Sequence, residues 1–209
     1  MVKRLMKSIR EFKGASIKAP IFVSLEVVME VVIPLIMADL IDRGINGGNM
    51  PYILKTGLIL VLAALMSLCF GALAGKYAAT ASAGFAKNLR RDMYSHVQDY
   101  SFSNIDRFST AGLVTRLTTD VTNIQNAFQM ILQICTRAPV TLIVALFMAF
   151  SISAKLSTVF LVAIAFLGVM IVILIPKAMR YFRQMFRKYD AVNGVVKENV
   201  GAIRVVKAF

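Results

Sequence analysis

The chain has 209 residues, 58% of them hydrophobic, and a formal net charge of +13. Its mean hydropathy of +0.70 excludes an ordinary soluble domain, which is about half apolar, and predicts an all-α membrane protein with several spans. The positive charge flanks the apolar stretches, so it reflects membrane topology and anionic lipid headgroups, and nucleic acid is excluded as a partner.

The first segment, residues 1–18, is basic and carries apolar side chains at helical spacing, at Val2, Leu5, Ile9 and Phe12. Lys and Arg residues lie between them, which is typical of a helix that lies in the membrane interface. No small-residue cleavage site of the kind that ends a signal peptide follows. The pattern predicts an amphipathic interfacial helix over 1–18 that leads into the first span.

Four apolar stretches come next, and a helix needs about 20 mostly apolar residues to cross the hydrocarbon core of a bilayer. They predict spans at about 19–41, 53–76, 130–152 and 156–175. The third stretch reaches spanning length only if its more polar beginning is included. Pro34 and Pro139 lie inside the first and third spans, where each removes a helix hydrogen bond, so both are candidate kinks.

Lys and Arg are distributed unevenly around these spans. Most lie in the N-terminal segment, in the connection between the second and third spans, and after the fourth span, whereas the opposite loops hold only Arg43, Lys55 and Lys155. Short loops rich in Lys and Arg remain in the cytoplasm. The distribution predicts a multi-pass protein of the plasma or inner membrane with both ends of this chain in the cytoplasm.

The connection between the second and third spans is much longer than a simple loop. Residues 77–100 are rich in Ala and contain no Pro, which predicts that the second span continues as a helix before the chain returns. At the tip, Asn104 can cap a short helix at about 104–111 whose Ile105 and Phe108 share one face. An exposed apolar face far from the lipid predicts a groove on another protein as its binding site.

Small residues recur every four positions along this second helix, at Gly71, Gly75, Ala79 and Ala83. Small side chains on one helix face allow another helix to approach closely. Two interpretations remain open for this face, a fixed contact between two helices and an interface that moves.

Away from the ends of the predicted spans, three charged residues lie inside them: Glu26 and Glu30 in the first and Arg137 in the third. Charges inside a membrane are costly and usually face protein or water. One interpretation is a structural ion pair between Glu26 and Arg137, with Glu30 on the same polar side. The other is a cavity in which the two carboxylates favour a cationic amphipathic substrate.

Several segments together resemble the transmembrane domain of ABC exporters. The stretch from Phe102 to Asp120 is similar to the first intracellular loop of that family, with two Phe residues, a turn of small residues, then Gly, Arg and Asp-Val. Pro34-Leu35 and residues 40–45 resemble the first span and its outer end, and residues 198–209 resemble the approach to the second intracellular loop. The resemblance covers essentially the whole chain in the expected order.

This resemblance implies a type-1 ABC exporter fold, with an N-terminal elbow helix and coupling helices that contact nucleotide-binding domains. The first coupling helix would contain Asn104, Ile105, Asp106, Arg107 and Phe108. The nucleotide-binding domain would belong to the same polypeptide or to a separate chain, and the second half of the transporter would make a homodimer or a heterodimer. The complete transporter would use ATP and Mg to export a multidrug, lipid or peptide type of substrate.

The chain departs from the family pattern because it ends in mid-helix, before a fifth span. The nearest match to a phosphate-binding P-loop runs from Gly71 to Tyr77; it is one residue short and has Tyr in place of the hydroxyl that binds magnesium. We therefore expect a non-enzymatic fragment with no catalytic residue, no metal and no cofactor of its own. The alternatives are a truncated, non-transporting partner subunit and a self-contained four-span membrane carrier.

Overall fold

The computed structural model describes residues 2–100 and 110–206. Every element within those residues is helical, which confirms the predicted all-α fold. By contact the chain divides into two compact units, residues 1–148 and 149–209.

Four helices are long and apolar enough to cross a membrane, as many as the sequence predicts, while the bounds of the spans stay a prediction. The helical segments that contain them are Arg10–Ile45, Met50–Gln98, Ala111–Ile152 and Ala154–Ala202. Each is considerably longer than the hydrocarbon core requires, because a helix rises only about 1.5 Å per residue and about 20 residues suffice. Each helix is therefore long enough to extend beyond the lipid if it spans a bilayer.

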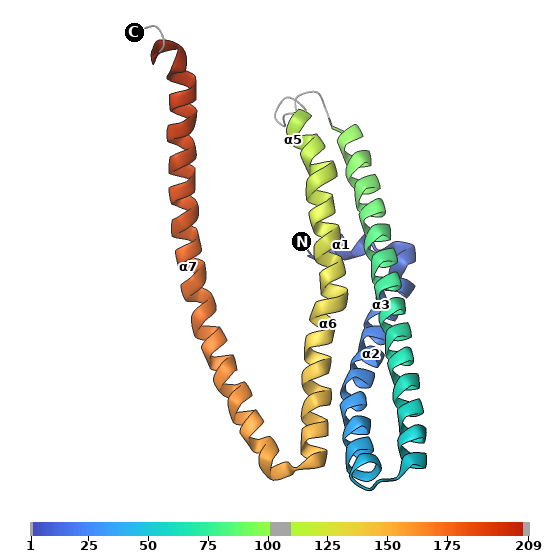
Figure 1. Ribbon diagram of the computed structural model, residues 1–209. Coiled ribbons are helices and arrows are strands. Elements are labelled where there is room, and N and C mark those ends of the chain that lie inside the picture. The colour runs from blue at the N-terminus through green and yellow to red at the C-terminus, as the bar shows by residue number, and fades with distance from the viewer. Residues whose placement is uncertain (1, 101–109, 207–209) are drawn as a thin grey trace. The chain divides into compact units, whose positions relative to one another are not determined.

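The N-terminal segment is divided where the sequence pattern predicts one continuous helix. Helix α1, Val2–Lys7, is followed by a 3-10 turn, Arg10–Phe12, and α2, Lys13–Asp39, begins within the predicted interfacial segment. The backbone of Arg10 has a φ of 40°, in the left-handed region, which redirects the chain. As a result α1 crosses the direction of α2 and does not continue it (Figure 1).

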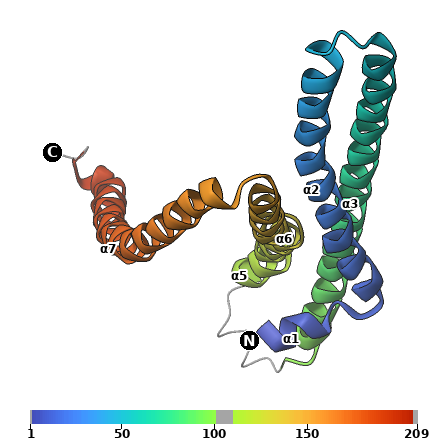
Figure 2. The same ribbon diagram turned by 90° about the horizontal axis from the view of Figure 1, so that it is seen from below.

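At the other end, α2 closes in a π-helical turn, Leu40–Ile45, and a short loop leads to α3, Met50–Gln98. The side chain of Asn49 caps α3 by accepting a hydrogen bond from the backbone N–H of Tyr52 at 3.2 Å. Gly48 has a φ of 61°, a conformation that glycine adopts without the steric cost of a Cβ. This loop makes α2 and α3 an antiparallel pair (Figure 2).

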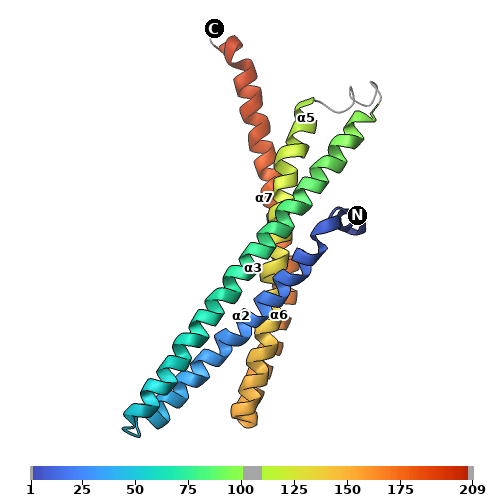
Figure 3. The ribbon, with the colours of Figure 1, turned by 90° about the vertical axis from the view of Figure 1, so that its right-hand side faces the viewer.

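The single helix α3 contains both the second predicted span and the predicted helical extension after it. With 49 residues it is about 70 Å long. The chain then returns through α5, Thr110–Thr115, a π-helical turn, Arg116–Asp120, and α6, Val121–Ile152. Figure 3 shows α6 beginning beside the second half of α3.

The contacts between the extensions of α3 and α6 include an aromatic pair and a buried apolar cluster. The rings of Phe85 and Phe128 are 4.8 Å apart between centroids, and Val121 is completely buried in a cluster with Phe85, Ala86 and Leu89. Val121 is the Val of the Asp-Val pair in the loop motif, so its burial gives that motif position a packing role. Close packing between α3 and α6 allows the two helices to transmit a displacement along their length.

Small residues mediate the close approach of α2 and α3, and only the beginning of the four-residue repeat takes part: Gly71 lies against Glu26 of α2. The residues buried against α2 include Ala74, Ala78 and Ala81, whereas Ala79 and Ala83 are exposed. The repeat of four drifts around a helix with 3.6 residues per turn, so the contact switches to neighbouring positions. A close approach of another helix at Ala79 and Ala83 therefore stays a prediction.

The second unit contains the end of α6 and α7, Ala154–Val206. Only Ser153 separates the two helices, and its carbonyl accepts a hydrogen bond from the buried hydroxyl of Ser157 at 2.7 Å. Helix α7 also continues well beyond the predicted fourth span. Its side chains are largely exposed.

Candidate functional site

Three charged residues meet inside the apolar part of the first unit. Glu30 Oε1 lies 2.7 Å from Arg137 Nη2, and Glu26 Oε1 lies 3.4 Å from Arg137 Nη1. The two glutamates are one turn apart on α2, so both reach across to the same guanidinium on α6. The structure thus brings together all three charged residues that the sequence singles out.

The two carboxylates are not equivalent. The Glu26 side chain is 19% exposed and the Glu30 side chain 51% exposed. Glu30, with the shorter contact, is the closer partner of Arg137, whereas Glu26 is the more buried and the less tightly paired. Two carboxylates facing one guanidinium leave a formal surplus of one negative charge.

A glycine makes room for the Glu26 carboxylate. A Cβ placed on Gly71 of α3 would lie 3.0 Å from Glu26 Oε1 and 3.2 Å from Glu26 Cδ. Nearby, Val23 and Val27 are buried against Ala74 and bring α2 and α3 together. The carboxylate therefore rests against bare backbone on α3.

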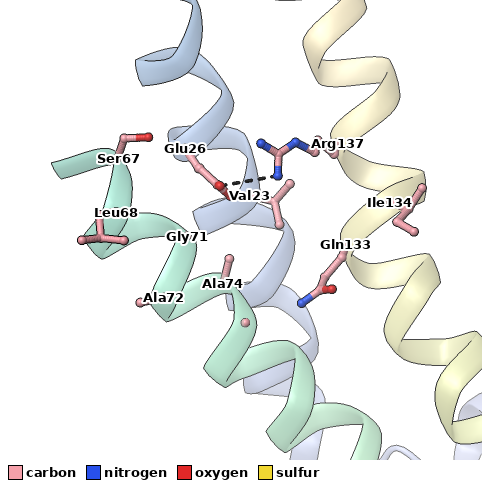
Figure 4. Close-up of a pocket in the computed structure, with 11 residues that line it drawn as sticks. Val23, Glu26, Ser67, Leu68, Gly71, Ala72, Ala74, Gln133, Ile134 and Arg137 are labelled. Carbon is pink, nitrogen blue, oxygen red and sulfur yellow. Dashed lines mark hydrogen bonds and ion pairs between the residues drawn. The ribbon is translucent and has the colours of Figure 1, made fainter. Parts of the chain in front are cut away.

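A cavity of about 580 Å³ opens beside this carboxylate, between α2, α3 and α6. Figure 4 shows Glu26 and Arg137 on one side of it, with Gln133 of α6 and Ser67 of α3 among the other polar residues that line it. Leu68 contributes to its apolar surface. A concave apolar site with a few convergent polar groups is the usual form of a ligand pocket.

The two interpretations of the charged residues therefore meet in one site. The ion pair with Arg137 is present, and Glu26 also lines the cavity, while Glu30 is not among the described residues that line it. The sequence did not predict that Ser67 lines the cavity, or that Gly71 leaves room for the carboxylate of Glu26. The available signal for the close contact at Gly71 was its position within a predicted span, in a repeat of small residues.

The remaining predicted site residues include two prolines and the residues of the coupling helix. Pro34 and Pro139 are inside α2 and α6, and their role as kinks stays a prediction. The predicted coupling residues lie outside the described residues; these are Asn104, Ile105, Asp106, Arg107 and Phe108.

Comparison with known proteins gives a consistent match. The family model for the ABC transporter transmembrane region matches residues 17–209. An uncharacterized ABC transporter ATP-binding protein of Bacillus subtilis is 31% identical over 183 residues, which cover 88% of this chain and 32% of that protein. A protein of the same description from Mycobacterium tuberculosis is 30% identical over 85% of this chain and 30% of its own length.

A more distant relative is named for a substrate. The ATP-dependent lipid A-core flippase of Wigglesworthia glossinidia brevipalpis is 21% identical over 97% of this chain and 33% of its own length. This chain spans about a third of the length of these curated relatives.

Proposed function

Because this chain belongs to the family of ABC transporter transmembrane regions, we propose that it forms part of the substrate pathway of an ATP-driven exporter. The observation that carries the proposal is the cavity beside Glu26 and Arg137, within helices that are apolar enough to cross a membrane. Charged residues in such helices are expensive and mark the paths of substrates or ions. In the complete transporter, ATP and Mg would drive the movement.

The long extensions of α3 and α6 would couple this pathway to a nucleotide-binding domain. Helix α3 runs from the loop at Asn49 to Gln98 without a break, and the pair Phe85–Phe128 ties it to α6. A displacement at the far end of two packed helices reaches the cavity, since packed helices move as units. The nucleotide-binding domain would bind the segment that includes Ile105 and Phe108.

The substrate that fits the cavity best is amphipathic and carries a positive charge. The surplus carboxylate favours a cation, and Leu68 and Ile134 offer apolar contact. One relative is named as a lipid A-core flippase, which supports a lipid among the multidrug, lipid or peptide substrates proposed for this chain. An incoming cation would pair with Glu26, while Arg137 keeps the closer contact with Glu30.

The proposed topology follows from the distribution of Lys and Arg, whereas export as the direction of transport rests on the family resemblance alone. Lys and Arg flank the spans on the side of the N-terminal segment and the long extensions, so that side would be cytoplasmic. The nucleotide-binding domains would lie there, and a second half of the transporter, identical or different, would complete the pathway.

The test is transport by the intact protein in proteoliposomes, with ethidium as a permanent cation and NBD-ceramide as an uncharged probe. Glu26→Gln keeps the shape of the side chain and removes its charge. We expect ATP-driven ethidium transport to fall about fivefold, the equivalent of about 1 kcal/mol, with ceramide transport unchanged. Glu198→Gln, at an exposed position on α7, is the matched control.

Two results would contradict the proposal. If ATP drives transport of neither probe, the cavity beside Glu26 is not a pathway for cationic or lipid-like amphipathic substrates. If Glu26→Gln lowers transport of both probes equally, the carboxylate supports the structure of the cavity and does not select the charge of the substrate.

A further inference from the structure

A second polar cluster fastens the N-terminal segment to α3, far from the cavity along the helix. Asp92 uses both carboxylate oxygens: Oδ1 lies 2.7 Å from Arg10 Nη2, and Oδ2 accepts a hydrogen bond from the Ser8 hydroxyl at 3.0 Å. One turn earlier on α3, Asn88 Nδ2 donates to the Ser8 carbonyl at 3.0 Å. Ser8 and Asn88 are both buried.

Apolar contacts hold the same segment. Ile9 is buried in a cluster with Phe85 and Leu89. The ring of Phe12 lies against the backbone of Gly84, where an added Cβ would come within 2.4 Å of the ring atoms. Residues 8–12 therefore occupy one face of α3, at positions that repeat at helical spacing between Gly84 and Asp92.

The backbone of this segment indicates that these contacts determine its shape. Arg10 has the only positive φ among the described residues other than glycine, 40°, a region that L-residues with side chains adopt at a cost. Such conformations persist when the surrounding contacts fix them. Here Ser8 and Ile9 precede Arg10 and Phe12 follows it, and all of them contact α3.

We propose that Asp92 is a positioning residue that holds residues 8–12 on the extension of α3, so that this segment and the extension move as one body during transport. The inference rests on the proposed function where it concerns the transport cycle, and on geometry alone for the resting protein. Helix α1 precedes the segment and exposes Met6, which is 53% exposed, as expected of an interfacial helix. Asp92 would thereby join the extension of α3 to the membrane surface.

The alternative is that α2 and α3 alone set the direction of the extension. Their contacts run from the loop at Gly48 up to the level of Ala78 and Ala81, which pack with Ala19. Beyond that level, α2 gives way to the turn at Arg10–Phe12. On this side, residues 8–12 therefore hold the part of α3 from Gly84 to Asp92. Loss of the Asp92 carboxylate should loosen this contact.

The proximity of the two elements can be measured by pyrene excimer fluorescence in the intact protein, in lipid nanodiscs. Pyrene would be attached at Lys7→Cys and Ser95→Cys, which are exposed and border the same hollow next to Asp92, after every native Cys of the intact protein, Cys69 and Cys135 among them, is replaced by Ala. Variants labelled at one position only correct for excimers between two copies of the chain.

We expect strong excimer emission in the nucleotide-free protein and the same emission after trapping with ATP and vanadate. Asp92→Ala should lower the excimer-to-monomer ratio by about two- to threefold, as expected when an exposed ion pair and a hydrogen bond are lost. Asp92→Glu should restore part of it. Asp99→Asn, at the end of the same helix and without an ion pair among the described residues, is the control.

A second readout separates positioning from simple stability. Asp92→Ala should lower the ethidium transported per ATP hydrolysed by about two- to threefold, with basal ATP hydrolysis unchanged and with recovery in Asp92→Glu. If Asp92→Ala fails to fold, Asp92→Asn, which keeps the size of the side chain, should also lower the ethidium transported per ATP hydrolysed.

The outcomes that overturn the inference differ from those that overturn the proposed function. If the wild-type excimer signal falls on trapping, the segment leaves α3 during the cycle and the two do not move as one body. If Asp92→Ala and Asp92→Asn leave the resting signal unchanged, Asp92 does not hold the segment. Because the resting measurement needs no ATP, it decides the role of Asp92 even if no ATP-driven transport is found.

Discussion

The carboxylate of Glu26 lies against Gly71, where a side chain would come within 3.0 Å of Oε1. A glycine on α3 thus decides how closely an acidic side chain on α2 can pack inside the apolar region. The position of Glu26 in turn sets its 3.4 Å contact with Arg137 and its place in the wall of the cavity.

Gly71→Ala tests this relationship. The new methyl group would push the end of a flexible side chain by a few tenths of an ångström, so we expect a loss of about 1 kcal/mol, at the low end for overpacking. Ethidium transport should weaken as Glu26 shifts. Thermal unfolding in detergent measures the loss of stability. Gly75→Ala is the control, because a Cβ at Gly75 meets nothing within 4 Å. Equal melting temperatures for the two variants would contradict the prediction.

Arg137→Met leaves two carboxylates without their cation. Removal of one partner of a buried pair costs about 3–5 kcal/mol, but the side chains here are partly exposed, so we expect about 1–3 kcal/mol. The double variant Arg137→Met with Glu30→Gln should recover part of this loss, since one unpaired carboxylate is then neutral. The melting temperatures of the single and double variants give the comparison; no recovery would mean that Glu30 contributes little to the pair.

Gly84→Ala should displace the N-terminal segment. Its Cβ would come within 2.4 Å of the Phe12 ring, and an aromatic ring cannot bend away as a carboxylate can. We expect faster tryptic cleavage at Arg10 by about five- to tenfold, because a segment that opens more often is cut more often. Gly57→Ala, where a Cβ meets nothing within 4 Å, should leave cleavage unchanged. Equal rates in both variants would show that Phe12 can be accommodated elsewhere.

Phe108→Ala tests the predicted contact with a nucleotide-binding domain. If this side chain seats in a groove of that domain, its loss should keep basal ATP hydrolysis and reduce ethidium transport by about tenfold, as for the loss of a central aromatic contact. Tyr100→Ala, also between the second and third spans, is a comparison variant for the general effect of losing an aromatic ring there. Transport and hydrolysis that fall in parallel would point to loss of folding and against a role in coupling.

Much of the fold could be predicted from the sequence because it depends on local composition. Length and apolarity predicted four long apolar helices, and the absence of Pro from residues 77–100 predicted that α3 is one continuous helix there. The division at Arg10 was not predictable from helical spacing, since Ile9 and Phe12 fit the pattern and a left-handed residue is stabilised here by contacts with a distant part of the chain.

The candidate site could be predicted in its residues but not in its arrangement. Glu26, Glu30 and Arg137 stand out because charges are rare in apolar helices. Which carboxylate pairs more closely with Arg137 depends on the rotation of α2 against α6, and which one lines the cavity depends on Gly71. Neither is encoded in the spacing of the acidic residues.

By itself the sequence determined a helical membrane protein, its spans, and the few charges placed within them, because these follow from the hydrophobicity of successive residues and the length of a helix. Only the tertiary structure decided that Glu26 faces the cavity, that Glu30 is the closer partner of Arg137, and that Asp92 holds Ser8 and Arg10. These relationships join residues about 80 to 110 positions apart. They are set by the rotation and register of packed helices, which side-chain volumes fix at each contact.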